Sequence, residues 1–143
     1  MKELPSFARQ SIDEIIASRH GICGVDYELE KYDEYSEEAD QLFMDDFGAH
    51  LADKAVNIVL DRSFHAKEDR EYFRKLIEAS RARWVLVYSK LEAETLWRRI
   101  CDQRKGEINA NSALDISEKL FNRYVDGFEH PDGEGKIIVE YTA

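Results

Sequence analysis

Residues 55–60, AVNIVL, form a short apolar run that contains a single polar residue. A second run of this kind, WVLVY, occupies residues 84–88. Neither run alternates between apolar and polar side chains, which is typical of strands covered on both faces and therefore of a parallel sheet. Residues 135–141, which begin within the glycine-rich turn sequence PDGEG, predict a third strand, and residues 7–10 predict a fourth.

Amphipathic helices are predicted between these strands. Apolar residues recur at three- and four-residue steps, which gives each helix one apolar face. The last helix is preceded by the capping-box sequence SALD at residues 112–115. Strands that alternate with helices predict an α/β protein, here a three-layer α/β/α sandwich with a mainly parallel sheet in a single domain spanning residues 1–143. The repeating residues are Tyr35, Ala39, Leu42, Phe43 and Phe47; Tyr72, Phe73, Leu76 and Ile77; Ala93, Leu96, Trp97 and Ile100; and Ile116, Leu120, Phe121, Tyr124 and Phe128.

The bulk composition is that of one globular domain, with 143 residues, 43% of them hydrophobic and 35% charged. The net charge of -10 argues against an extended nucleic-acid surface, while a local basic pocket for a small anion stays open. Cys23 and Cys101 form no CxxC pair, and no apolar signal sequence follows Met1. No apolar run reaches the roughly 18 residues needed to cross a bilayer. We therefore expect a cytoplasmic protein without membrane contact.

The histidines are scattered, and only His20 and Cys23 have a spacing that suggests a metal-binding pair. Two ligands cannot build a structural zinc site, so no metal site is expected from these residues. The acidic segment at residues 26–40, which also contains three tyrosines, is either a solvated helix face or a surface for a basic peptide.

Three stretches of the chain resemble P-loop kinases of the zeta-toxin and polynucleotide-kinase type. They are residues 11–16 (SIDEII), residues 59–64 (VLDRSF) and residues 96–100 (LWRRI), and their order and spacing resemble the family over nearly the whole chain. The resemblance implies the use of ATP and Mg²⁺ to phosphorylate a hydroxyl group. It also implies a nucleotide as one partner and a small molecule, sugar or nucleic-acid end as the acceptor.

The resemblance assigns roles to three residues on the acceptor side. Asp13 would orient the acceptor hydroxyl and accept its proton, and Arg62 would contact the acceptor as a second catalytic residue. Asp61 would also belong to the substrate-binding site, where it would contact a magnesium-bound water. The alternatives are structural. Asp13 would lie in the first turn of a helix that begins near Ser11, where the helix dipole stabilises a carboxylate. Asp61 would cap the next helix, and Arg62 would pair with a surface carboxylate.

A basic cluster near the end of a predicted helix contains Lys105 and the three arginines Arg98, Arg99 and Arg104. In the resembling kinases, lid arginines close over the nucleotide and neutralise charge on the transferred group, so the resemblance makes all three nucleotide-binding residues and Arg99 a catalytic one. The alternative is a helix carboxyl terminus at which cations suit the dipole and pair locally with Asp102 and Glu107.

The phosphate-binding motif of these kinases, GxxxxGK[ST], does not occur in the 143 residues. In the resembling kinases, the strand before that loop lies between the strands that match residues 55–60 and 84–88. Without it these two strands would have unpaired edges, and we expect them to pair directly with each other. Pairing with a second chain, and hence self-association through exposed sheet edges, or aggregation are the alternatives.

These observations predict the scaffold of an ATP-dependent phosphotransferase that is inactive or weakly active in this form, because the missing loop supplies much of the positioning and charge neutralisation. The alternative is a non-catalytic remnant that acts as a binding module, or a fragment from an incomplete gene model.

Overall fold

The computed structural model describes residues 7–53, 56–106 and 116–140. The described chain is a mixed α/β protein with five α-helices and two short parallel two-stranded sheets. It divides into two compact units, the first built from residues 7–53 and 56–63 and the second from residues 64–106 and 116–140. The predicted capping box at residues 112–115, Ala55 at the start of one predicted strand and Tyr141 at the end of another lie outside the described residues.

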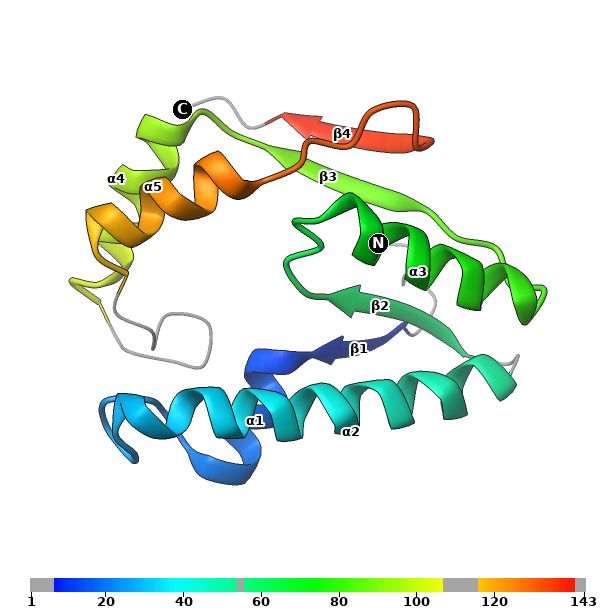
Figure 1. Cartoon of the computed structure of the whole chain (residues 1–143), viewed down its shortest axis with the longest axis horizontal. Coiled ribbons are helices and arrows are strands. Elements are labelled where there is room, and N and C mark those ends of the chain that lie inside the picture. The colour runs from blue at the N-terminus through cyan, green and yellow to red at the C-terminus, as the bar shows by residue number, and fades with distance from the viewer. Residues whose placement is uncertain (1–6, 54–55, 107–115, 141–143) are drawn as a thin grey trace, which may run out of the picture. The chain divides into compact units, whose positions relative to one another are not determined.

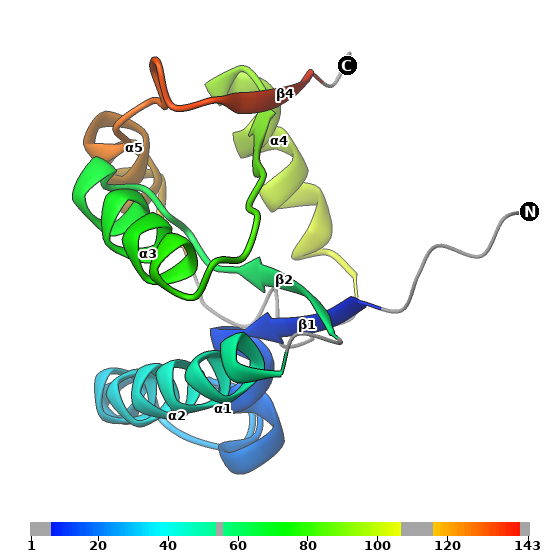
Figure 2. The same cartoon turned by 90° about the vertical axis from the view of Figure 1, so that its right-hand side faces the viewer.

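The first unit contains one parallel strand pair and two α-helices. The register of the strand pair runs from Phe7 opposite Asn57 to Ser11 opposite Asp61. Both helices lie on the same side of the strand pair (Figures 1 and 2). The elements are β1 (Phe7–Ser11), α1 (Ile12–His20), the 3-10 helix η1 (Leu29–Lys31), α2 (Tyr32–Ala52) and β2 (Asn57–Asp61).

Local sequence explains how α1 begins. Ser11 is its N-cap residue, and the Ser11 hydroxyl accepts a hydrogen bond from the Glu14 backbone N–H at 3.4 Å. The predicted four-residue repeat of α2 is confirmed, because Ala39, Phe43 and Phe47 are all buried along one face of that helix. These side chains supply most of the apolar core of the first unit.

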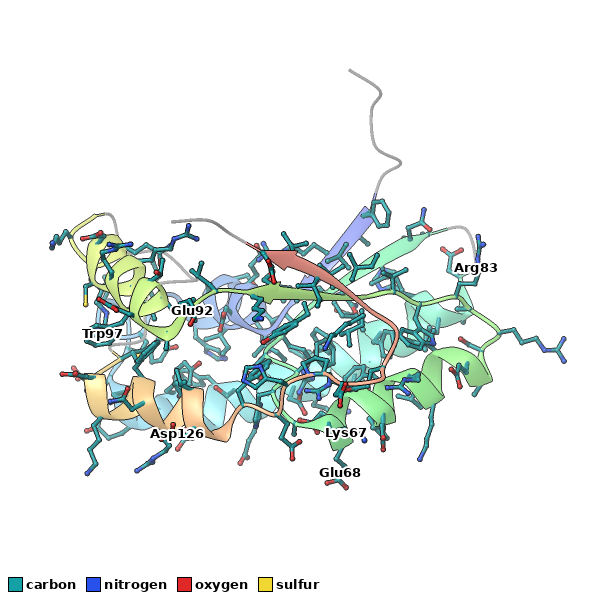
Figure 3. The ribbon with its side chains drawn as sticks, turned by 90° about the horizontal axis from the view of Figure 1, so that it is seen from above. Lys67, Glu68, Arg83, Glu92, Trp97 and Asp126 are labelled. Carbon is teal, nitrogen blue, oxygen red and sulfur yellow. The ribbon has the colours of Figure 1, made fainter. Side chains whose placement is uncertain are left out.

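The second unit contains the other strand pair and three helices. β3 (Leu86–Lys90) and β4 (Lys136–Glu140) are parallel, with Leu86 opposite Lys136 and Lys90 opposite Glu140. Trp97 of α4 packs against Phe121 of α5, with ring centroids 5.1 Å apart, and Figure 3 shows Trp97 on the side of α4 nearest α5. The helices are α3 (Lys67–Ala79), α4 (Ala93–Gln103) and α5 (Glu118–Gly127).

A buried ion pair ties α3 to the turn before β4. The Arg70 guanidinium donates to both carboxylate oxygens of Glu134, at 3.0 and 3.1 Å, and to the backbone carbonyl of Phe64 at 2.7 Å. Arg74 adds a longer contact of 3.3 Å to Glu134. Arg70 and Glu134 are each 5% exposed, so two opposite charges lie within the interior of this unit and satisfy each other.

The strands agree with the sequence-based expectation in number and direction, but not in their pairing. In the described part of the chain β2 pairs with β1, and β3 pairs with β4, so neither of these two sheets contains the expected direct pairing of residues 55–60 with residues 84–88. Each sheet also keeps apolar side chains in contact with solvent, with Val59 45% and Val87 59% exposed. The strands are therefore not covered on both faces. This differs from the coverage on both faces that their unbroken apolar sequence had indicated.

None of the helices in the described ranges is both long enough and apolar enough to cross a membrane.

Candidate functional site

The carboxyl ends of β1 and β2 lie side by side. Ser11 is the last residue of β1 and stands opposite Asp61, the last residue of β2. Helix α1 begins directly after Ser11, which places Asp13 in its first turn. The loops beyond the carboxyl ends of parallel strands are where open α/β sheets bind ligands. Two residues predicted from separate parts of the sequence, Asp13 and Asp61, thus meet at one edge.

Arg9 links the acidic groups at this edge. Its Nε–H donates to Oδ2 of Asp61 at 3.0 Å, and its Nη2–H donates to the same oxygen. Its Nη1–H donates to Oε1 of Glu14, the residue after Asp13. The side chains of Arg9, Glu14 and Asp61 are between 42% and 50% exposed, so these ion pairs are accessible to solvent and individually weak.

The surroundings of Asp13 change the pKa of its carboxyl group. Partial desolvation by neighbouring protein atoms raises the pKa of Asp13 above its ordinary value, the negative charge of Asp61 raises it further, and the positive charge of Arg9 opposes both effects. The residue as a whole stays exposed. Asp13 therefore lies where the structural alternative placed it, in a first helical turn, and it also interacts with the end of the neighbouring strand.

Asp61 does not cap the following helix. The N-cap residue of α3 is Ala66, whose side chain makes no capping hydrogen bond. The Asp61 carboxylate is instead held by Arg9 on the neighbouring strand. The structural alternative for Asp61 is therefore wrong, because its partner is a strand residue and not a helix terminus.

Arg62 is oriented towards α2. Its Nη1–H donates to Oδ1 of Asp40 at 2.8 Å, and its guanidinium carbon lies 5.1 Å from the centroid of the Phe43 ring. The side chain is 23% exposed. This arrangement matches the structural alternative, in which Arg62 pairs with a surface carboxylate, and it combines the ion pair with a cation–π contact.

The three predicted lid arginines belong to the second unit. Arg98 and Arg99 are exposed in the middle of α4, and Arg104 is its C-cap residue. Of their predicted local partners, Asp102 accepts a hydrogen bond from Lys105 at 3.2 Å, and Glu107 lies outside the described residues. Only Arg104 lies at the negative end of the helix dipole, as the structural alternative requires, because the last turn of α4 contains no basic residue.

The donor set at the β1–β2 edge does not fit a magnesium ion on its own. Mg²⁺ is held through one or two carboxylates together with waters and substrate phosphates. Here the Asp61 oxygen accepts both of the N–H donors that Arg9 directs at it, which already neutralises its charge. Within the described ranges, no group of three or more His, Cys, Asp or Glu side chains is arranged to hold a metal. These residues therefore do not form a magnesium site by themselves.

Two residues of this edge were not singled out from the sequence. Arg9 lies in the short strand predicted at residues 7–10, but its partner Asp61 is 52 residues away. Asp40 ends the acidic segment that was predicted to be either a solvated helix face or a surface for a basic peptide, and it holds Arg62. An arginine in a strand, two residues before a helix cap, was the available signal for Arg9. Nothing in the local sequence distinguishes Asp40 from the neighbouring acidic residues.

Comparison with known proteins identifies no relative: no protein-family model matches this chain, and neither a curated protein nor a solved structure matches it.

Proposed function

We propose that this chain has the scaffold of an ATP-dependent phosphotransferase of the P-loop kinase type, acting on a hydroxyl acceptor with ATP and Mg²⁺. The 143-residue chain by itself has little or no activity, because it contains no GxxxxGK[ST] loop to hold the triphosphate. In this proposal Asp13 orients the acceptor hydroxyl and takes its proton, Arg62 contacts the acceptor, and Arg98, Arg99 and Arg104 neutralise the phosphates.

The observation that carries the proposal is the meeting of Asp13 and Asp61 at the carboxyl ends of two parallel strands. A proton-accepting carboxylate works best when its pKa is closer to the working pH, and the direction of the Asp13 shift suits that role. A reacting hydroxyl would transfer its proton to Asp13 as its oxygen bonds to the γ-phosphorus, and ADP would leave with the electron pair of the broken bond.

The three-layer sandwich is part of the same proposal. α1 and α2 lie on one side of the β1–β2 pair (Figure 2), and the apolar residues Phe7 and Val59 are exposed on the pair. Apolar side chains on the uncovered face of a sheet suit burial by a further layer. We propose that a further layer covers this face of the β1–β2 pair in the state that carries out ATP-dependent phosphoryl transfer.

A second candidate function is a binding module without catalysis. The observation that favours it is the exposure of several large apolar side chains around β3 and β4, among them Val85, Val87 and Ile137. Clusters of exposed apolar residues are typical of protein interaction surfaces. This candidate involves no nucleotide, so ATP turnover that depends on Asp13 would favour the phosphotransferase over it.

The experiment compares the purified 143-residue chain with its Asp13→Asn and Asp33→Asn variants. Asp33 is a matched control because it is an exposed aspartate in the first turn of α2. We expect no heat when ATP and Mg²⁺ are titrated into the chain, and ATP turnover at or near the level of buffer. Turnover that is lost in Asp13→Asn and kept in Asp33→Asn would support the phosphotransferase scaffold and contradict the proposed inactivity. Turnover that both variants keep would contradict the role of Asp13.

A further inference from the structure

The outer edge of β4 is open in the described part of the chain. β4 hydrogen-bonds to β3 on one side, and no described strand pairs with its other side. Its central residues are exposed, with Ile137 at 54% and Ile138 at 46%, and Val139 is exposed as well. A short, apolar strand with a free edge is a template for pairing with another strand.

The sequence of β4, KIIVE, is complementary to itself when two copies run antiparallel. If the two strands are centred on Ile138, Lys136 of one copy stands opposite Glu140 of the other, at both ends of the pair. Ile137 then stands opposite Val139, and Ile138 opposite its own counterpart. Opposite charges and β-branched pairs directly across two strands are both stabilising.

The other described strands lack this property. Centred in the same way, β3 would place Lys90 opposite Leu86, and β2 would place Asp61 opposite Asn57. β1 would place Phe7 opposite Ser11. A parallel pair of β4 strands would align Lys136 with Lys136 and Glu140 with Glu140. Among the described strands, charge complementarity therefore selects β4, and it selects antiparallel over parallel pairing.

Both charged groups have bonding capacity left for a second copy. The Lys136 ammonium donates to the backbone carbonyl of Pro131, and an ammonium has three N–H donors. Glu140 approaches Lys90 only to 3.9 Å, and its side chain is 70% exposed.

We propose that two copies of this chain associate through antiparallel pairing of their β4 edges, about a two-fold axis that passes beside Ile138. The product is a four-stranded sheet in the order β3, β4, β4, β3. Such an interface is isologous and closes after two chains, so it forms a dimer and not a fibre. One five-residue strand buries little surface, so the dimer is weak and depends on protein concentration.

The test is sedimentation equilibrium of the full 143-residue chain at concentrations up to about 1 mM. The unmodified chain is expected to reach a dimer mass. Lys136→Glu places Glu opposite Glu at both ends of the pair, and Glu140→Lys places Lys opposite Lys, so each variant alone is expected to stay monomeric. An equimolar mixture of the two variants restores opposite charges at both ends, and it is expected to form a heterodimer.

The proposal is overturned if the unmodified chain stays monomeric at the highest concentration, if either single variant dimerises like the unmodified chain, or if the mixture stays monomeric. Circular dichroism establishes that each variant is folded. If a charge variant fails to fold, Ile138→Cys decides the question, because oxidation should link two copies at this position and leave the unmodified chain, with Cys23 and Cys101, unlinked. The readout is association, so the result does not depend on phosphoryl transfer.

Discussion

Arg9 stands opposite Val59 in the parallel register of the first sheet, yet its guanidinium binds Asp61, two residues further along the neighbouring strand. Positions two apart on a strand share a face, so the side chains of Arg9 and Asp61 meet diagonally. The ion pair holds the negative charge of Asp61 at the end of the sheet, where Asp13 experiences both charges. The pKa of Asp13 therefore depends on the charges of Arg9 and Asp61.

The first prediction concerns the pKa of Asp13. Asp61→Asn removes a negative charge that raises the pKa of Asp13, so this variant should lower it. Arg9→Gln removes the positive charge that opposes the shift, so this variant should raise it further. The measurement is the pH titration of the Asp13 carboxyl carbon by NMR in the folded chain. Asp33→Asn is the control and should leave the titration unchanged; equal values in all four proteins would mean that the three side chains do not interact.

The second prediction concerns the buried ion pair of the second unit. Glu134→Gln leaves the Arg70 guanidinium buried without its carboxylate, which should lower the free energy of unfolding by about 3 kcal/mol. Denaturant unfolding measures the change. Glu68→Gln is a matched control on an exposed residue in the first turn of α3 (Figure 3), and it should cost less than about 1 kcal/mol. Similar losses in the two variants would contradict burial of the pair.

The third prediction is the pH dependence that this pair produces. Hydrogen bonding from Arg70 lowers the pKa of Glu134 below its ordinary value. The folded state therefore binds a proton less readily than the unfolded state, and the contribution of Glu134 to stability is complete above about pH 4.3, the ordinary pKa of glutamate. It is lost as the pH falls through the lower, folded-state pKa. Unfolding measured from neutral to acidic pH should show a shallower acid loss in Glu134→Gln than in the unmodified chain.

The fourth prediction concerns the apolar face of α2. Phe47→Ala removes a fully buried ring and leaves a cavity, which should destabilise the chain by about 3 to 5 kcal/mol. Phe7→Ala removes the same atoms from a ring that is 50% exposed, so it should cost much less. Thermal and denaturant unfolding measure both variants. A cost for Phe7→Ala equal to that for Phe47→Ala would show that the exposed ring is covered in solution.

The fifth prediction concerns the Arg62–Asp40 contact. A double-mutant cycle with Arg62→Ala and Asp40→Ala should give a coupling energy of about 0.5 to 1 kcal/mol, because the pair is only partly shielded from water. A coupling near zero would mean that Arg62 is free to turn away from α2, towards an acceptor at the sheet edge. The unfolding free energies of the two single variants and the double variant supply the measurement.

Much of the local structure follows from residues that are close in the sequence. The spacing of Ala39, Phe43 and Phe47 predicts α2 and its buried face, and the structure confirms both. The apolar runs predict parallel strands, and residues 84–88 overlap β3, which begins two residues later than predicted. Helical and strand periodicities depend on neighbours within a few positions, so they can be read without knowing the rest of the fold.

Burial was predicted less well where charges are involved. The pattern of α3 indicated an apolar face that contains both Tyr72 and Phe73, but Tyr72 is 53% exposed and Arg70 is buried in its place. A buried arginine is stable only with a partner, and its partner Glu134 lies 64 residues further along the chain. No local pattern can reveal such a pair, because neither residue differs by itself from a surface charge.

The amino-acid order alone sets where helices and strands form, which helix faces are apolar, and that Asp13 and Asp61 each follow a strand, because these properties depend on short-range sterics and side-chain spacing. Only the three-dimensional fold decides that β1 joins β2 and β3 joins β4, that Arg9 holds Asp61, and that Arg70 is buried with Glu134. The physical reason is that parallel strands pair through connections of a dozen or more residues, so their partners are chosen by long-range packing and not by adjacent residues.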